Sequence, residues 1–453
     1  MSRYSSHPWV ALSLVSLGLG LGTSAFGAGF QVQNQSVRSS AMANAGVAAS
    51  AEDGSTIFYN PAGMIHLDRQ FTQNVIFLAP KFRFVDSGDS TNAIGGEPIG
   101  RTTSNGGAAV SPIFIPSGYL VWPLSERFYL GLGMNGPYGN RTEYDEDWIG
   151  RYHAVQSEIF PININPSVAY KVNDQWSLGA GFSVSYIDAE LDQAVDFGTL
   201  GFLAGVPGVR PSDPRYDGFS VLTGDGWGWG FNAGVLYEPR PGTRIGLAYR
   251  SQIEFDVEGE QELDVPDFAV PLAGPSRTRD ATAEITVPDT IHLSAVHRLD
   301  ERWTLLADIK WTNWSDFEEL RVEIDEPGAS DSVQPENWDD AWRIAVGTSY
   351  RFDDRWTFRG GIAWDQEPIP SDLFRTPRLP GDNRWWFSTG ATYRFSRSLE
   401  FDAFYTYIYL DDYTIDNTEV ATGDAAGLPI GSTLDGDYES DAHIYGVSVL
   451  WRF

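Results

Sequence analysis

Cysteine is absent from this chain of 453 residues, so disulfide bonds and thiolate metal sites are excluded. Histidine is sparse, and no two histidines after residue 27 stand at metal-ligand spacing beside a third ligand. The sequence motifs of serine hydrolases, P-loop enzymes and zinc proteases are missing as well. We therefore predict a protein with no cofactor, no metal and no catalytic residue.

Long apolar runs are confined to the start of the chain. Residues 1–27 combine a cationic start at Arg3, an apolar run over 9–21 and a small-x-small pattern ending at Gly27, which predicts a signal peptide cleaved near Gly27. No later run reaches the roughly 18 apolar residues that a transmembrane helix needs. The exported chain is therefore either soluble or a β-barrel.

Basic residues are few, because 31 Lys and Arg stand against 61 Asp and Glu, for a net charge of -30. Such a surface repels polyanions, which excludes nucleic acid as a partner. A solvated acidic exterior is the first interpretation. Contact with lipopolysaccharide phosphates through divalent cations is the alternative.

Period-two alternation is abundant after residue 70. Apolar residues alternate with small or polar ones, and the rows begin or end in aromatic residues, as at Trp342 and Tyr350. A soluble sandwich also alternates, but its outer face carries Lys, Glu and Thr in place of Gly and Ser. The pattern predicts an all-β fold, a 14-stranded antiparallel transmembrane β-barrel, with strands over 70–84, 111–123, 126–134, 154–172, 175–191, 226–238, 243–257, 281–299, 302–313, 340–352, 355–364, 383–395, 398–410 and 442–453.

The connections between these strands alternate between short and long, as do the periplasmic turns and external loops of an outer-membrane barrel. The last strand alternates up to a terminal Phe453, a pattern that predicts recognition by the barrel assembly machinery. We expect a monomer in the outer membrane of a Gram-negative bacterium, in contact with outer-membrane lipid and lipopolysaccharide.

Residues 28–69 differ from the rest because small residues dominate them, and they contain Asn60-Pro61-Ala62 near their end. They hold too few large apolar groups to build a core of their own. We predict that residues 28–69 form a plug, or hatch, inside a barrel made by residues 70–453.

Two of the long loops are unusually apolar, which predicts ligand contact. Packing of the two loops on each other as a lid is a compatible alternative. Gly131 and Gly133, on the third predicted strand, either permit a kink in the wall or are merely small lumen-facing residues. The apolar loop residues are Phe197, Leu200, Phe202 and Leu203 in one loop, and Phe268, Val270 and Leu272 in the other.

Several blocks resemble the FadL family of outer-membrane transporters for long-chain fatty acids and other hydrophobic compounds. They are Ala28-Gly29-Phe30-Gln31, Asn60-Pro61-Ala62, and residues 227–234, 247–251, 311–317, 340–345 and 356–364. The resemblance covers the whole chain after residue 27. It implies passive uptake, in which a ligand lands between the apolar loops and passes to an inner pocket near Phe30. After the hatch rearranges, the ligand leaves sideways through a kink in the third strand, which favours a lateral gate at Gly131 and Gly133.

One departure from the family concerns the ligand head group. The resemblance implies an Arg and a Lys that hold a carboxylate, and Gln193 and Gln334 align with them. Either another cation, such as Arg210 or Arg343, substitutes, or the ligand is an uncharged alkane or aromatic hydrocarbon. We expect fatty acids ahead of hydrocarbons. An outer-membrane lipid hydrolase, an adhesin and a general porin are the alternatives from other classes.

Overall fold

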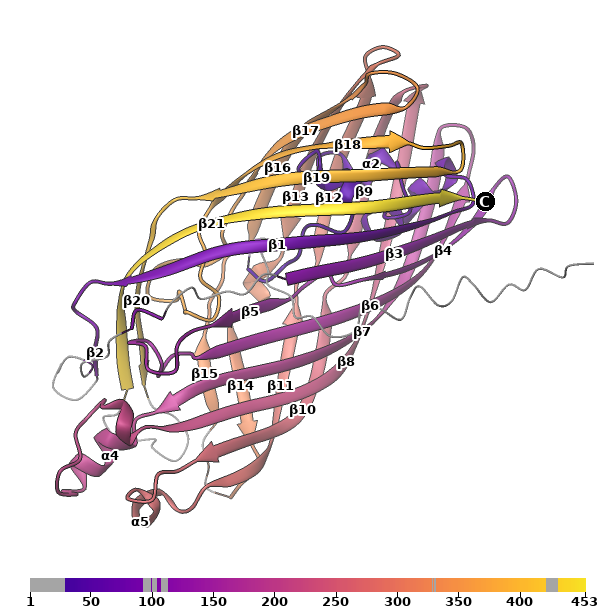
Figure 1. Cartoon of the computed structure of the whole chain (residues 1–453). Coiled ribbons are helices and arrows are strands. Elements are labelled where there is room, and N and C mark those ends of the chain that lie inside the picture. Colours follow the sequence, from indigo (N-terminus) through magenta and orange to yellow (C-terminus); the bar gives the residue numbers. More distant parts are fainter. Residues whose placement is uncertain are drawn as a thin grey trace, which may run out of the picture.

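The computed structural model describes residues 29–92, 99, 104–106, 113–327, 329, 331–420 and 431–453. The predicted signal peptide lies outside the described residues. All described strands belong to one antiparallel sheet, and β1 (Gln70–Asp86) pairs with the last strand, β21 (Gly431–Arg452), so that the sheet closes into a barrel (Figure 1). Among the described residues, none of the helices has the length and apolar composition needed to cross a bilayer.

Fourteen strands make the wall, as predicted. Of the 21 described segments, six continue another segment across a short break, and β2 (Thr91–Asn92) lies in a loop beside β21. Between β1 and β21 the wall contains β3 (Ile113–Pro123), β4 and β5 (Phe128–Asn135, Asn140–Glu143), β6 (Gln156–Lys171), β7 (Trp176–Val195), β8 (Gly218–Arg240), β9 and β10 (Thr243–Arg250, Ile253–Asp264), β11 and β12 (Arg277–Val287, Thr290–Arg298), β13 and β14 (Trp303–Thr312, Glu319–Ile324), β15 and β16 (Ser332–Pro335, Ala341–Arg351), β17 (Trp356–Asp365), β18 (Arg384–Arg394), and β19 and β20 (Leu399–Leu410, Tyr413–Val420).

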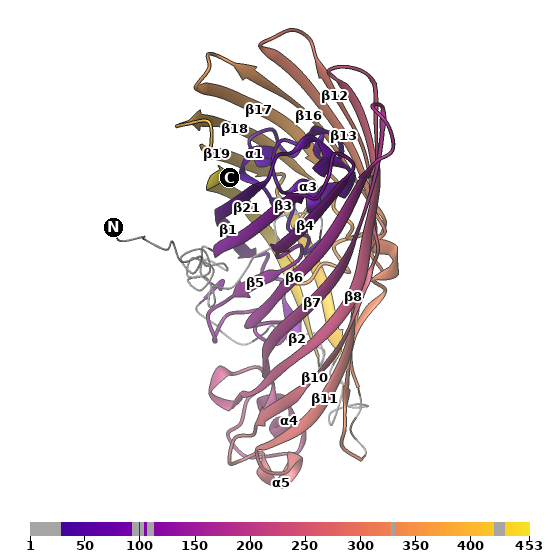
Figure 2. The same cartoon turned by 90° about the vertical axis from the view of Figure 1, so that its right-hand side faces the viewer.

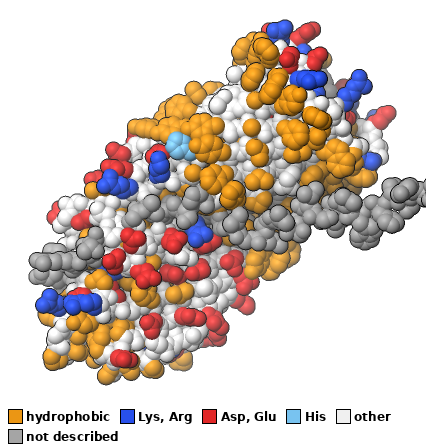
Figure 3. Space-filling model, in the orientation of Figure 1, with side chains coloured by type: hydrophobic (Ala, Val, Ile, Leu, Met, Phe, Trp, Pro, Cys, Tyr) orange, Lys and Arg blue, Asp and Glu red, His pale blue; other side chains and the backbone are white. Residues whose placement is uncertain are grey.

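The outer face of the wall is apolar in one part and acidic in the other. Large apolar side chains such as Phe182, Trp229 and Val346 are exposed, while their strand neighbours point into the barrel. On the face seen in Figure 3, apolar side chains gather over the part of the barrel near the C-terminus, and acidic side chains are frequent over the opposite part. This is the surface expected where only one part of the wall meets hydrocarbon.

Residues 29–69, called the hatch below, fill the barrel lumen (Figure 2). They fold into short turns, α1 (Val37–Ser40), α2 (Val47–Ser50), α3 (Thr56–Tyr59) and η2 (Pro61–His66). Close packing explains their small side chains and the glycines opposite them. A Cβ on Gly246 of β9 would collide with the carbonyl of Ala48, and a Cβ on Gly234 would collide with the Asn60 side chain.

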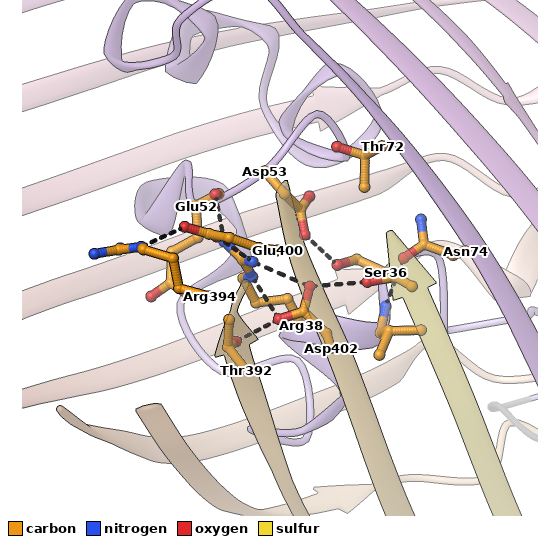
Figure 4. A network of polar contacts seen from close by, with 12 residues as sticks. Ser36, Arg38, Glu52, Asp53, Thr72, Asn74, Thr392, Arg394, Glu400 and Asp402 are labelled. Carbon is orange, nitrogen blue, oxygen red and sulfur yellow. Dashed lines mark hydrogen bonds and ion pairs between the residues drawn. The ribbon is translucent and has the colours of Figure 1, made fainter. Parts of the chain in front are cut away.

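Polar bonds tie the hatch to strands all around the wall. Arg38 forms ion pairs with Glu400 (2.9 Å) and Asp402 (3.0 Å) of β19, in the network of Figure 4. Arg359 of β17 pairs with Glu52 at 2.8 Å. Further bonds join hatch backbone atoms to Asn74, Ser177, Asn232, Ser294 and Arg343.

Several wall strands reach further than predicted. β8 begins at Gly218, β10 extends to Asp264, and β20 and the first part of β21 occupy the predicted loop 411–441. Their outward residues are acidic or polar, as at Glu258 and Glu260, so the outer face lacks the apolar residues that mark the other wall strands. Ladder hydrogen bonds hold these extensions together with inward apolar residues such as Ile415, Leu434 and Tyr438, which are buried. The predicted strand 281–299 begins earlier, at Arg277, and is broken between β11 and β12 at Pro288, which has no N–H to donate.

Candidate ligand-binding site

The two apolar loops meet at the end of the barrel opposite the C-terminus (Figure 1). One contains α4 (Phe197–Leu203) and the short η3 (Pro214–Tyr216), and the other contains α5 (Val270–Ala273). The Asp196 carboxylate caps α4 by accepting a hydrogen bond from the Thr199 amide at 2.8 Å. Phe197 is buried in the apolar cluster that joins the loops, and Leu200, Phe268 and Val270 pack against it.

Three of the predicted loop residues face outward instead. Phe202, Leu203 and Leu272 are 54%, 44% and 42% exposed. The loops therefore pack on each other and still present an apolar surface, which leaves ligand contact at that surface a prediction.

Phe30 lies at the centre of a buried aromatic cluster inside the barrel. Its ring centroid is 5.0 Å from that of Trp314 and 5.7 Å from that of Phe317, and Trp338 and Tyr138 complete the cluster. The clustered residues Trp314 and Phe317 come from η4 (Trp314–Asp316) and the residue after it, where the chain leaves the wall between β13 and β14. Sequence reasoning found Phe30 but missed its partners, although Trp314 and Phe317 stand in a block that resembles the family.

Gln193 is bonded to a cation that the sequence did not single out. The Nη2 atom of Arg378 donates to Gln193 Oε1 at 2.8 Å, and its Nη1 donates to the Gln156 carbonyl and to Ser157 Oγ. Arg378 belongs to the loop between β17 and β18, and its carbonyl accepts a hydrogen bond from Asn140 of β5 at 2.7 Å. This loop therefore crosses toward the opposite wall and brings a guanidinium to the predicted head-group position.

The surroundings of Arg378 join it to the aromatic cluster. Its neighbour Leu379 packs against that cluster and, with Gly29, lines a cavity with about 390 Å³ of empty space, part of it open to solvent. Glu336 interacts electrostatically with Arg378 and accepts a hydrogen bond from Trp338 Nε1 at 2.8 Å. Burial raises the pKa of Glu336, which lies in the loop before β16, to about 8.

The other proposed head-group residues lie elsewhere. Gln334 is on β15, and among the described residues its hydrogen bond goes to the carbonyl of its neighbour Pro335 at 3.4 Å. Arg210 is exposed in the α4 loop. Arg343 is buried and donates to the Ala43 carbonyl of the hatch at 2.8 Å.

The hatch residues Asn60, Pro61 and Ala62 form the junction between α3 and η2. Asn60 Oδ1 accepts a hydrogen bond from the Ala62 amide at 3.0 Å, which caps η2. Its Nδ2 donates to the Ala48 carbonyl at 2.7 Å and to the Val235 carbonyl of the wall at 3.2 Å. Asn60 therefore holds two turns of the hatch and one wall strand together.

Gly131 and Gly133 lie in a regularly paired part of β4, opposite Val121 and Tyr119 of β3. They face the hatch, and a Cβ on Gly131 would approach Met64 and Ile57. The wall is interrupted a few residues later, at 136–139 between β4 and β5. There the hatch supplies the bonds, because the Val32 amide donates to the Pro137 carbonyl (2.9 Å) and the Gly139 amide to the Phe30 carbonyl (2.9 Å).

Comparison with known proteins agrees with this geometry. Residues 18–453 match the family described as outer membrane protein transport protein (OMPP1/FadL/TodX). The chain is 31% identical over 415 residues to the long-chain fatty acid transport protein of Salmonella typhi, over 88% of this chain and 90% of that protein. A Pseudomonas aeruginosa FadL homologue has a similar crystal structure, with a TM-score of 0.83 and 27% identity over 94% of this chain and 100% of that one. The Ralstonia pickettii toluene transporter TbuX shares the fold, with a TM-score of 0.65 and 19% identity over 95% and 99%. The chain therefore belongs to the family of outer-membrane transport proteins that includes FadL and TodX.

Proposed function

We propose that this barrel is a passive channel for hydrophobic molecules and that long-chain fatty acids are its preferred ligands. The observation that carries the preference is Arg378, a half-buried guanidinium next to Leu379, which packs against the aromatic cluster. A fatty acid needs both features, because its chain gains from apolar contact and its carboxylate from a charge-assisted hydrogen bond.

Two hydrogen-bond donors of Arg378 remain for a ligand. The bonds of Arg378 to Gln156, Ser157 and Gln193 use three of its five N–H groups, and the Nε–H and one Nη2–H have no partner among the described residues. Two donors on adjacent atoms match the two oxygens of a carboxylate. Gln193 then orients the cation, and the charge that the aligned glutamine lacks comes from Arg378.

The proposed route follows the apolar surfaces. A ligand is captured at Phe202, Leu203 and Leu272, with Phe197, Leu200, Phe268 and Val270 forming the base of that surface. It then reaches the cluster around Phe30. Displacement of the hatch segment 29–35 from residues 136–139 opens the wall, and the small surface of Gly131 and Gly133 leaves the hatch room to move.

Uncharged hydrocarbons are the second candidate. The cluster of Phe30, Trp314, Phe317 and Trp338 contains no charged side chain, so it holds an alkyl or aromatic group without help from Arg378. The toluene transporters that share the fold favour this alternative only as a fold-level analogy.

We further propose that the protein performs no catalysis. Ser432 Oγ lies 2.9 Å from His153 Nε2, and His153 Nδ1 lies 3.3 Å from Glu419, an order that resembles a hydrolase triad. Ser432 and His153 are 1% and 0% exposed, so no ester can approach the hydroxyl. Ser432→Ala should therefore leave ligand uptake and lipid composition unchanged.

The remaining assignments are part of the same proposal. Residues 1–27 act as a cleaved signal, residues 28–69 as the hatch and residues 70–453 as the barrel. The monomer contacts outer-membrane lipid and lipopolysaccharide, and the strand ending at Phe453 is read by the assembly machinery.

Mass spectrometry of small molecules extracted from the purified barrel tests the ligand class, followed by competition with oleate and with toluene. Fatty acids that oleate displaces would support the proposal. Neutral lipids alone, together with competition by toluene and none by oleate, would replace fatty acids by hydrocarbons as the ligand.

A further inference from the structure

Arg250 of β9 is a buried cation that has no acidic partner. It is 7% exposed, and its Nη2 and Nη1 donate to the Phe58 carbonyl (2.8 Å) and to Ser183 Oγ (3.1 Å). Among the described residues it forms no ion pair, and its Nε–H has no acceptor. A guanidinium removed from water without a counter-ion is costly, so an anion that reached it would be bound strongly.

A cavity adjoins this cation. Its lining includes Arg250, Thr290, His292 and Phe58, together with Gln31 and Gln33 of the hatch. The Asp308 carboxylate contacts the cavity residue His292 (3.2 Å) and Ser294, and among the described residues it forms no ion pair with Arg250.

The hatch segment that carries Phe30 separates this cavity from the aromatic cluster. Phe30 packs in the cluster, whereas Gln31 and Gln33 line the cavity. Lys310 holds both glutamine side chains, with 2.9 Å from Nζ to Gln33 Oε1. The hatch segment therefore presents Phe30 to the cluster and the two amides to the cavity that Arg250 also lines.

Arg250 also lies near the interruption in the wall. Its register partner Thr290 follows Pro288 by two residues, and the Pro288 carbonyl accepts a hydrogen bond at 2.9 Å from Tyr138 Oη, in the break between β4 and β5. An anion that moves from the cluster toward this break would therefore pass close to Arg250.

We propose that Arg250 is a second carboxylate-binding residue, which receives the head group of a fatty acid between Arg378 and the opening at 136–139. This inference rests on the proposed function. The carboxylate passes from one guanidinium to the next, so it never lies unpaired in the lumen. Because Arg250 also holds the Phe58 carbonyl, its test must separate ligand binding from anchoring of the hatch.

The separation comes from paired ligands that differ only in head group. Cells that lack their own channel would express the full chain, and uptake of labelled oleate and of oleyl alcohol would be compared. Arg250→Gln should lower oleate uptake about tenfold or more, and it should leave oleyl alcohol uptake within about twofold of that of the parent chain. Arg250→Lys, which keeps the charge, should restore most of the oleate uptake.

Asn232→Ala is the matched control for anchoring, because Asn232 Nδ2 donates to the neighbouring Ile57 carbonyl of the hatch at 2.9 Å and is neutral. Asn232→Ala should change the uptake of oleate and of oleyl alcohol by the same factor. If Arg250→Gln also lowers the uptake of both ligands equally, or leaves oleate uptake unchanged, Arg250 only anchors the hatch and the inference is overturned.

A second variant does not depend on loss of Arg250. Thr290 is the register partner of Arg250 on β12 and faces the same side, so Thr290→Asp supplies an internal carboxylate to the cation. This variant should raise thermal stability and lower oleate uptake selectively, whereas Thr290→Asn should do neither. Equal uptake of oleate by Thr290→Asp and the parent chain would contradict the proposal. A parent chain that carries oleyl alcohol but no oleate would instead overturn the fatty-acid function itself.

Discussion

Arg38 of the hatch and Glu400 of β19 form an ion pair of 2.9 Å in which both side chains are buried, and Asp402 shares the same guanidinium. Burial of the two carboxylates is tolerated because Arg38 pairs with both, and Glu400 also pairs with Arg394 and Arg452, each at 2.9 Å. These ion pairs attach the hatch to the wall at β19, so their loss should lower the stability of the folded protein.

Arg38→Met should destabilise the protein by about 3–5 kcal/mol, because it leaves Asp402 buried without an ion-pair partner among the described residues, whereas Glu400 keeps Arg394 and Arg452. Thermal or denaturant unfolding of the purified barrel measures the change. Arg83→Met is the control, since the pair of Arg83 with Glu439 is exposed and worth less than about 1 kcal/mol. Equal effects of the two substitutions would show that the buried pair is not special.

Arg378→Gln should weaken oleate binding about 10- to 100-fold, the worth of a charge-assisted bond, and leave oleyl alcohol binding nearly unchanged. Titration calorimetry in detergent gives both affinities. Arg210→Gln serves as the control, because Arg210 is exposed in the α4 loop. Loss of oleate binding in the Arg210 variant alone would move the head-group site to that loop.

Oleate binding should also weaken as the pH rises through about 8. Burial raises the pKa of Glu336 from 4.5 to about 8, so its carboxyl is neutral near pH 7 and ionises above pH 8, where it competes for Arg378. The same shift makes Glu336 a stabilising group below its unfolded pKa, and that stability is lost as the pH rises to 8. Affinity measured from pH 6.5 to 9.5 tests this, and Glu336→Gln should flatten the profile between those limits. A wild-type profile without the inflection would refute the role of Glu336.

Gly131→Ala should loosen the hatch without breaking the wall. The added Cβ would lie 2.6 Å from Met64 Sδ and 2.7 Å from Ile57 Cγ1, so the hatch must shift at a cost of about 1–3 kcal/mol. Hydrogen exchange of hatch amides should rise while exchange in β3 and β4 stays low. The control is Gly360→Ala, where the nearest atom, the Ser388 carbonyl oxygen, is 3.7 Å away. Increased exchange in β4 itself would favour a kink at the glycine.

The barrel was predictable from sequence because hydrocarbon on one side and the lumen on the other impose a strict alternation. Trp342, Ile344 and Val346 are exposed on β16 while their neighbours face inward, as the pattern predicted. The outer extensions escaped prediction because their outer face is acidic or polar, so the large apolar side chains that mark the membrane part of the wall are missing from it. Glu258 and Glu260 stand on a strand that only its hydrogen-bond partners reveal.

The candidate site was only partly predictable, for a different reason. Phe30, Phe197 and Phe268 could be found because apolar residues are conspicuous in polar surroundings. Arg378 could not, because it lies 185 positions from Gln193, and only the path of the loop between β17 and β18 brings the two together. Alignment with the family identified Gln193 as a head-group position, but a single sequence does not show that Arg378 lies beside it and supplies the charge.

The hydrogen bond between Arg38 and Asp402 joins residues that are 364 positions apart in the chain. The hatch also forms bonds to strands from most of the intervening chain. Contacts of such sequence separation form late and slowly, because the loop-closure entropy must be overcome first. The hatch can dock only after the last strands have crossed the inner membrane and joined the sheet. Until then, the N-terminal segment has no fold of its own, so the cell's holding chaperones must protect it for the whole time that the barrel takes to close.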